Sequence, residues 1–332
     1  MPRWRNRPDG SNWGDFGPDD QIGRMNWLTP ERRLAGVREV REGIAFSLSL
    51  PLDYPGGQMV PFRAPPRLFG ARDEHVCQYN HVWDGGGEIT CDDYVVLHTQ
   101  YSTQWDSLAH HGRLFDADGD GVAEKVYYNG YRADEHLVGP AEDGAVQARA
   151  LGIETLATAG VQGRGVMINL QAAFGMDARP IGYDDLMRTI DAQQVEVRKG
   201  DFALFYSGYD RLLLNMNRQP DQARLMSHCA MIDGSDERLC QWIVDSGVVA
   251  LCSDTMAVEW LGNFGSPDPC VAPLPLHDLC LFKQGIFLGE LWYLEELAAW
   301  LLEHNRSAFL LTAPPLRLPG SVGSPLTGIA TV

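Results

Sequence analysis

Residues 98–111 read His98-Thr-Gln-Tyr-Ser-Thr-Gln-Trp-Asp-Ser-Leu-Ala-His110-His111, and this stretch holds the densest group of potential catalytic side chains in the chain. Its polar members Gln100, Gln104, Asp106 and His110 follow one another at even spacing. On an extended strand, even spacing places side chains on one face, whereas a turn within the stretch would bring them to one point. From these residues alone, an active site and a polar strand edge with a hydrogen-bonded histidine are equally good interpretations.

Apolar runs bounded by turn residues predict strands on both sides of this stretch, and residues with helical spacing lie between them. The predicted strands are 44–52, 93–98, 165–170, 202–206 and 248–252. The predicted helices are 31–40, 183–192, 237–245 and 293–304. This mixture predicts an α/β protein that forms one domain over residues 1–332. Residues 1–40 are expected to form an N-terminal helical segment, and the proline-rich residues 308–332 a C-terminal arm over the body or a neighbouring subunit.

Composition excludes several classes of partner. The chain has 332 residues, with 27 Lys and Arg against 44 Asp and Glu, which gives a net charge of −17. Nucleic acid and anionic membrane surfaces are therefore not expected partners, because both require clustered basic residues. No run approaches the roughly 18 apolar residues of a membrane span, and the N-terminus lacks an apolar signal segment. Seven scattered cysteines without a CxxC pair are typical of reduced thiols, so we expect a cytoplasmic location.

Aligned on Asp106, the stretch resembles the signature of the cyclase family, the superfamily that includes bacterial kynurenine formamidase and isatin hydrolase. That signature is His-x-Gly-Thr-His-x-Asp-x-Pro-x-His. Thr103, Asp106 and His110 match it, whereas Gln100 and Gln104 stand in place of the first two histidines. The two remaining differences are Ser102 in place of glycine and Leu108 in place of proline.

Further stretches resemble the family in the same order along the chain. They are Trp13-Gly14 with 20–30, Tyr127–Gly130, Lys199–Tyr209, Pro275–Asp278 and Gly285–Glu290. The resemblance implies a swivelling β/β/α fold, with a mixed sheet or barrel and flanking helices, that assembles as a homodimer or homotetramer. It also implies an enzyme.

The resemblance also implies a set of site residues. In metal-dependent relatives the two histidines and the aspartate of the signature, with a later histidine and glutamate, hold a divalent ion. The corresponding residues here are Gln100, Gln104, Asp106, His277 and Glu290, with His110 as the proton-transfer residue beside Asp106. A carboxamide is a poor ligand for zinc or copper, so Asp106, His277 and Glu290 remain for one Mn, Mg or Zn ion. A metal-free site, in which the glutamines bind substrate, is the alternative.

Three functions follow from these residues. The first is hydrolysis of an amide, lactam or lactone in a small or medium cyclic or aromatic carbonyl compound, or the related ring closure, with His110 as general acid and base. The second is a metal-independent lyase, dehydratase or polyketide-type cyclase, and the third is a non-catalytic binding protein that has lost its metal. The predicted substrate contacts are Gln100, Gln104, Trp105, Tyr206 and Tyr209. We expect Gln104, Asp106, His110, His277 and Glu290 to converge on one pocket.

Overall fold

The centre of the protein is a curled mixed sheet. The computed structural model describes residues 2–83, 85–264 and 272–332, and within these ranges nine strands form this sheet. Their order is β1 (Ala45–Ser47), β19 (Ile329–Thr331), β17 (Ala308–Thr312), β11 (Gln162–Asn169), β13 (Phe202–Tyr206), β15 (Ala250–Ser253), β16 (Phe287–Glu290), β6 (Gln104–Asp106) and β18 (Gly323–Pro325). The strands β11, β13, β15 and β16 run parallel, whereas their neighbours on both sides are antiparallel.

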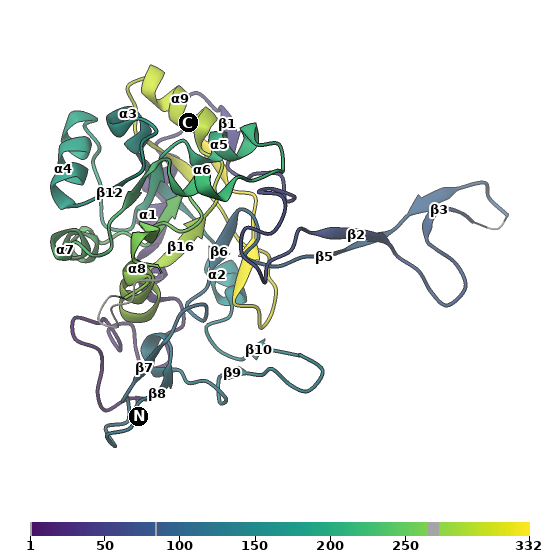
Figure 1. Cartoon of the computed structure of the whole chain (residues 1–332), viewed down its shortest axis with the longest axis horizontal. Helices are drawn as coiled ribbons and strands as arrows, with labels where there is room; N and C mark the ends of the chain where they lie inside the picture. The colour runs from purple at the N-terminus through teal and green to yellow at the C-terminus, as the bar shows by residue number, and fades with distance from the viewer. Residues whose placement is uncertain (1, 84, 265–271) are drawn as a thin grey trace.

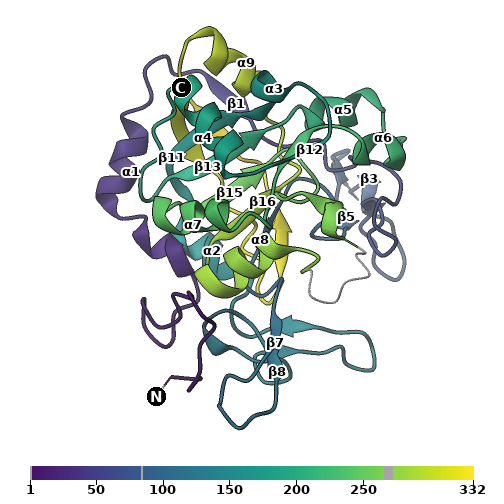
Figure 2. The same cartoon turned by 60° about the vertical axis from the view of Figure 1, so that its left-hand side comes forward.

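Helices cover the sheet. They are α1 (Pro30–Val37), α2 (Ile153–Ala159), α3 (Leu170–Phe174), α4 (Tyr183–Ala192), α5 (Tyr209–Asn215), α6 (Gln222–Met226), α7 (Glu237–Ser246), α8 (Pro275–His277) and α9 (Glu295–Glu303). Short 3₁₀ turns η1 (Gly23–Trp27), η2 (Tyr128–Gly130) and η3 (Leu261–Asn263) and the π-helix η4 (Asp278–Gln284) accompany them. Figure 2 shows α4 and α7 packed together in front of the parallel strands. The predicted α/β class, with a mixed sheet and flanking helices, is confirmed.

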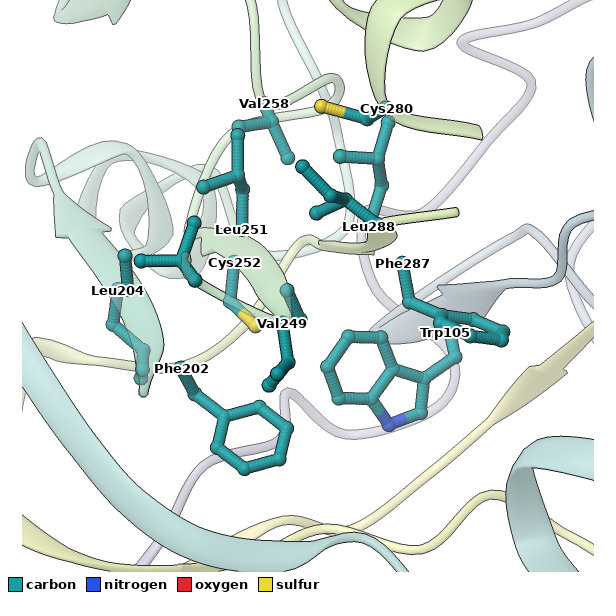
Figure 3. Close-up of a cluster of buried hydrophobic side chains, with 14 of the residues drawn as sticks. Trp105, Phe202, Leu204, Val249, Leu251, Cys252, Val258, Cys280, Phe287 and Leu288 are labelled. Carbon is teal, nitrogen blue, oxygen red and sulfur yellow. The ribbon is translucent and has the colours of Figure 1, made fainter. Parts of the chain in front are cut away.

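The parallel strands are buried because their sequences are almost continuously apolar, as parallel strands covered on both faces require. Every residue of β13 and β15 is buried. Figure 3 shows Phe202 and Leu204 of β13 beside Leu251 and Cys252 of β15 in the core. Helix α1 crosses β11 at close range, because a Cβ atom added at Gly36 would lie 2.6 Å from the Gly163 carbonyl carbon. A side chain at Gly36 would push the helix off the strand.

Residues 308–332 form strands of the sheet, in contrast to the extended C-terminal segment that the sequence predicted. They contribute β17, β18 and β19 to the central sheet. Phe309, Leu311 and Ala330 are fully buried, so apolar side chains between the prolines anchor this segment in the core. Proline residues lie in the connections and at the end of β18, where a strand loses few ladder hydrogen bonds.

A long ribbon projects from the body (Figure 1). It is built from the pairs β2 (Arg67–Gly70) with β5 (Asp93–Val96), and β3 (Tyr79–Val82) with β4 (Ile89–Cys91). We call residues 67–96 the arm. Large apolar side chains on it, such as Leu68 and Ile89, are exposed. Three further small sheets pair β7 (Arg113–Phe115) with β8 (Glu124–Val126), β9 (Leu137–Val138) with β10 (Gln147–Ala148), and β12 (Arg179–Ile181) with β14 (Ala230–Ile232).

Across the described ranges, the structure contains no helix with the length and apolar character needed to cross a membrane. Six cysteines carry free thiols, of which Cys77 and Cys91 on the arm are exposed. The seventh, Cys270, lies outside the described residues.

Candidate active site

The strands β6 and β16 bring the two ends of the predicted site together. Gln104 and Glu290 are cross-strand partners, and the Gln104 amide nitrogen donates to Glu290 Oε2 at 2.9 Å. The same nitrogen lies 3.3 Å from Asp106 Oδ1. Gln104 and Asp106 share one face of β6 because successive side chains on a strand point to opposite sides. All three side chains are buried, so these polar groups depend on one another for hydrogen bonds.

His277 lies between two carboxylates. It ends α8, and its Nδ1 is 2.6 Å from Glu259 Oε1, while its Nε2 is 3.4 Å from Glu290 Oε1. Glu259 also accepts hydrogen bonds from the backbone nitrogens of Leu276 and His277, which holds α8 in place. Burial acts to lower the pKa of His277, but Glu259 and Glu290 outweigh it and raise the pKa to about 10. Below that pH the imidazole is the buried cation of the site.

His110 lies at the edge of the cluster formed by Gln104, Asp106, His277 and Glu290. Its Nε2 lies 3.9 Å from Asp106 Oδ1, and its ring centre is 6.3 Å from that of His277. Burial lowers the pKa of His110 below its ordinary 6.5, against the opposing effect of Asp106. Its neighbour His111 has a pKa lowered to about 4, mainly by burial and secondly by the charge on His277. At neutral pH, His110 is therefore an uncharged imidazole that can accept a proton.

A cavity of about 650 Å³ opens in front of His110. Its wall includes His98, Thr99 and Gln100 before β6, and Lys125 and Tyr127 from β8 and the residue after it. Gln100 also packs against Gly323 of β18, the strand that pairs with Asp106 and its neighbours. The cavity is large enough for a drug-sized small molecule. The structure therefore brings His110, Asp106, Gln104, His277 and Glu290 together, with Gln100 in the wall of the adjoining cavity.

Three predicted substrate contacts take other positions. Trp105 has 0% of its surface exposed; it points away from Gln104 and Asp106, donates from Nε1 to the Ala313 carbonyl at 2.8 Å, and packs edge-on against Trp292. Side chains alternate between the two faces of a strand, so Trp105 points into the core while Gln104 and Asp106 point to the site. Tyr206 and Tyr209 are buried near Asp254 and do not line the cavity beside His110. Trp105, Tyr206 and Tyr209 therefore lie apart from the cavity wall, and their contact with substrate stays a prediction.

Two residues without a predicted role, Glu259 and Arg63, also lie at the site. Glu259 follows the buried strand β15, and acids after the carboxyl end of a parallel strand are a signal that could have identified it. Arg63 lies in the loop before the arm and lines the cavity. Burial dominates the pKa shifts of His110 and Glu290, and the charge on Arg63 adds a lowering effect to both. No sequence pattern marks Arg63, because it belongs to an irregular loop.

The donor atoms of the site fit a divalent ion. Ligand atoms of Asp106, His110 and His277 lie within 4.8 Å of one another. Glu290 borders this group, and burial together with the Asp106 charge raises its pKa. Among the described residues, Gln104 Oε1, Asp106 Oδ2 and Glu290 Oε1 are buried oxygens without a hydrogen-bond partner. Buried acceptors without donors are costly, and imidazole with carboxylates is a common donor set for Zn or Mn.

Comparisons with known proteins match the chain to one family and to several solved structures. The sequence profile of a family described as putative cyclase matches residues 46–260. A solved structure described as a novel cyclase is 30% identical, covers 97% of both chains and superposes with a TM-score of 0.75. Isatin hydrolase A from Labrenzia aggregata, bound to benzyl benzoate, is 14% identical over 89% of this chain and 95% of its own, with a TM-score of 0.56.

Isatin hydrolase A from Ralstonia solanacearum is 16% identical over 91% of this chain and 98% of its own, with a TM-score of 0.57. At these identities the two hydrolases show a shared fold. A search of curated proteins found no match.

Proposed function

The chain belongs to the cyclase family and is an enzyme of the hydrolase or cyclase kind, and from this premise we propose that it hydrolyses an amide, lactam or lactone, or closes the corresponding ring. The substrate would be a small or medium cyclic or aromatic carbonyl compound. The observation that carries this proposal is the position of His110, which is uncharged at neutral pH, beside Asp106 and at the wall of a 650 Å³ cavity.

In the hydrolytic reaction, His110 accepts a proton from a water molecule as that water attacks the substrate carbonyl. The same imidazole then donates the proton to the leaving nitrogen or oxygen. Asp106 lies 3.9 Å from His110 Nε2, close enough to favour the protonated form that the reaction creates. Gln100, in the cavity wall, is a proposed contact to the substrate, and Gln104 a proposed contact that also orients Asp106 and Glu290.

For the cofactor, we infer weak binding of one divalent ion, Mn, Mg or Zn, by Asp106, His277 and Glu290. The ion would polarise a carbonyl and lower the pKa of a bound water. Weak binding is supported by Gln104, whose amide protons already face both carboxylates. Protonation of His277 also competes with its use as a ligand.

The test is a panel of lactones, lactams and N-formyl amides, incubated with freshly purified enzyme and analysed by mass spectrometry. Hydrolysis adds one water to the substrate, whereas the alternative lyase or dehydratase reaction removes a group or a water. We expect products that have gained water, and far less of them with His110→Asn. A product that has lost water would favour the lyase or dehydratase, and binding without turnover across the panel would favour the non-catalytic alternative. Metal analysis of the same preparation measures bound Mn, Mg and Zn.

We also propose that the protein works as a homodimer or homotetramer in the cytoplasm. Support for assembly comes from the arm, where Leu68, Ile89 and Val96 are each more than half exposed. An isolated two-stranded ribbon is marginally stable in water, and an exposed apolar surface of this kind is typical of an interface. Light scattering coupled to size-exclusion chromatography measures the assembly, and a monomer at micromolar concentration would contradict it. Exposed free thiols on the arm are compatible with a reducing compartment.

A further inference from the structure

The cavity beside His110 differs in charge from the rest of the molecule. The whole chain carries a net charge of −17. Two cationic side chains, Arg63 and Lys125, line the cavity, against one acidic side chain, Asp134. The two cations come from separate parts of the fold, since Arg63 lies in the loop before the arm and Lys125 in β8. A positive wall in an acidic protein raises the local concentration of anions.

Arg63 has no carboxylate partner among the described residues. Some arginines elsewhere in the protein do have carboxylate partners: Arg164, for example, contacts both Glu39 and Asp201. The Arg63 guanidinium lies 5.8 Å from the centre of the Phe62 ring, and Phe62 itself is 74% exposed and lines the same cavity. The guanidinium therefore keeps its planar set of donors for a group that enters the cavity.

Gln100, which lines the same cavity, offers a second hydrogen-bond donor. Gln100 Oε1 accepts a hydrogen bond from Thr99 Oγ1 at 2.8 Å, and its Nε2 is buried with no acceptor among the described residues. Gln100 and Arg63 line both the main cavity and a smaller one that adjoins it. A buried amide N–H without an acceptor is costly, so a ligand acceptor that reaches the Gln100 amide would satisfy it.

We propose that Arg63 and Gln100 bind a carboxylate or similar anionic group on the substrate, so that the enzyme selects acidic carbonyl compounds over neutral ones. Lys125, which is more exposed, attracts the anion to the cavity. This proposal rests on the proposed function only in taking the cavity as the substrate site. Hydrogen bonds from Arg63 to a carboxylate are of the charge-assisted kind, which are the stronger ones.

The experiment measures binding, so it does not depend on turnover. The probes are anthranilate and 2-aminobenzamide, two fluorescent aromatic compounds of nearly the same shape, of which only the first is charged. Fluorescence anisotropy titrations give the Kd of each for the full-length enzyme. We expect the wild type to prefer anthranilate, and this preference to weaken as salt is added. Equal affinity of the wild type for the two probes would overturn the proposal.

Variants then locate the effect. Arg63→Met should weaken anthranilate binding about tenfold or more and leave 2-aminobenzamide nearly unchanged. Arg63→Lys should retain part of the preference, since the charge remains but the planar fork is lost. Arg67→Met is the matched control, because it removes the same charge four residues away on the arm, outside the cavity wall.

Two outcomes would contradict the assignment. If Arg63→Met weakens the binding of both probes equally, Arg63 maintains the shape of the cavity or balances the charge of Glu290 and does not contact the anionic group. If Arg67→Met produces the same selective loss, the preference arises from the general field of the basic residues and not from a contact with Arg63. Circular dichroism of each variant checks that the fold is retained. Failure of the catalytic proposal would leave these binding results unaffected.

Discussion

Gln104 and Glu290 lie directly opposite each other on the antiparallel strands β6 and β16, joined by a hydrogen bond of 2.9 Å across 186 positions of sequence. The same amide nitrogen reaches Asp106, so one neutral group serves two buried carboxylates. An amide supplies hydrogen-bond donors but no charge. The charge of the pair must therefore be balanced from elsewhere, and His277, 3.4 Å from Glu290, is the adjacent group that can carry it.

The first prediction concerns the pH dependence of stability. Burial alone would lower the pKa of His277, but the two glutamates raise it from 6.5 to about 10, so the folded protein binds this proton more tightly than the unfolded chain. The stabilisation is fully present below pH 6.5 and is lost as the pH rises through about 10. Urea titrations of the wild type should show a falling free energy of unfolding over this range.

The variant Glu259→Gln tests the ion pair between His277 and Glu259. Removing one charge from a buried ion pair should lower the free energy of unfolding by about 3 kcal/mol near neutral pH and flatten its pH dependence. Glu237→Gln, which changes an exposed glutamate at the start of α7, is the control and should leave both properties nearly unchanged. A wild-type stability that is level from neutral to alkaline pH would mean that His277 is uncharged in the folded protein.

His110→Asn should reduce kcat on the hydrolysed substrate by about 10²–10⁴-fold, with a small change in KM, because proton transfer is lost while the cavity is kept. In the wild type, kcat/KM should fall on the acid side at a pH below 6.5, since burial lowers the pKa of His110. Steady-state kinetics across pH measure both effects. His111→Asn removes the neighbouring imidazole, which does not line the cavity, and should cost much less activity. Equal losses in the two variants would contradict the role of His110.

Trp105→Phe separates a core role from a substrate contact. The change leaves the Ala313 carbonyl without its donor and a small void beside Trp292. We expect the free energy of unfolding to fall by roughly 2 kcal/mol and KM to stay the same. Trp83→Phe, on the exposed arm, is the matched control and should have little effect on stability. A raised KM with unchanged stability would restore Trp105 to the substrate site.

The sequence could predict the parallel strands β11, β13 and β15, because apolar runs bounded by turn residues are local signals. It could not show from periodicity that β16 lies beside β6, since strand order depends on packing between distant segments. Only the resemblance linked His277 and Glu290 to Asp106. A strand is expected at 93–98, but its place in a projecting arm could not be predicted, because Val95 and Val96 have the composition of a buried strand and yet are exposed.

The last prediction is that Gln100→His combined with Gln104→His creates a stronger metal site. Asp106, His277 and Glu290 already lie around the Gln104 side chain. Two added imidazoles would replace amide donors with nitrogen ligands, giving a mixed nitrogen and oxygen set that Zn and Mn accept. Equilibrium dialysis should show a gain of bound metal, and native turnover should fall because the Gln100 amide is lost from the cavity wall.

The double variant Gln100→Asn with Gln104→Asn, which keeps amides in both places, is the control and should gain no metal. Unchanged metal content in the histidine variant would show that the two positions do not face a common ion, while a rise in native turnover would show that the natural reaction depends on a metal held more tightly than we propose.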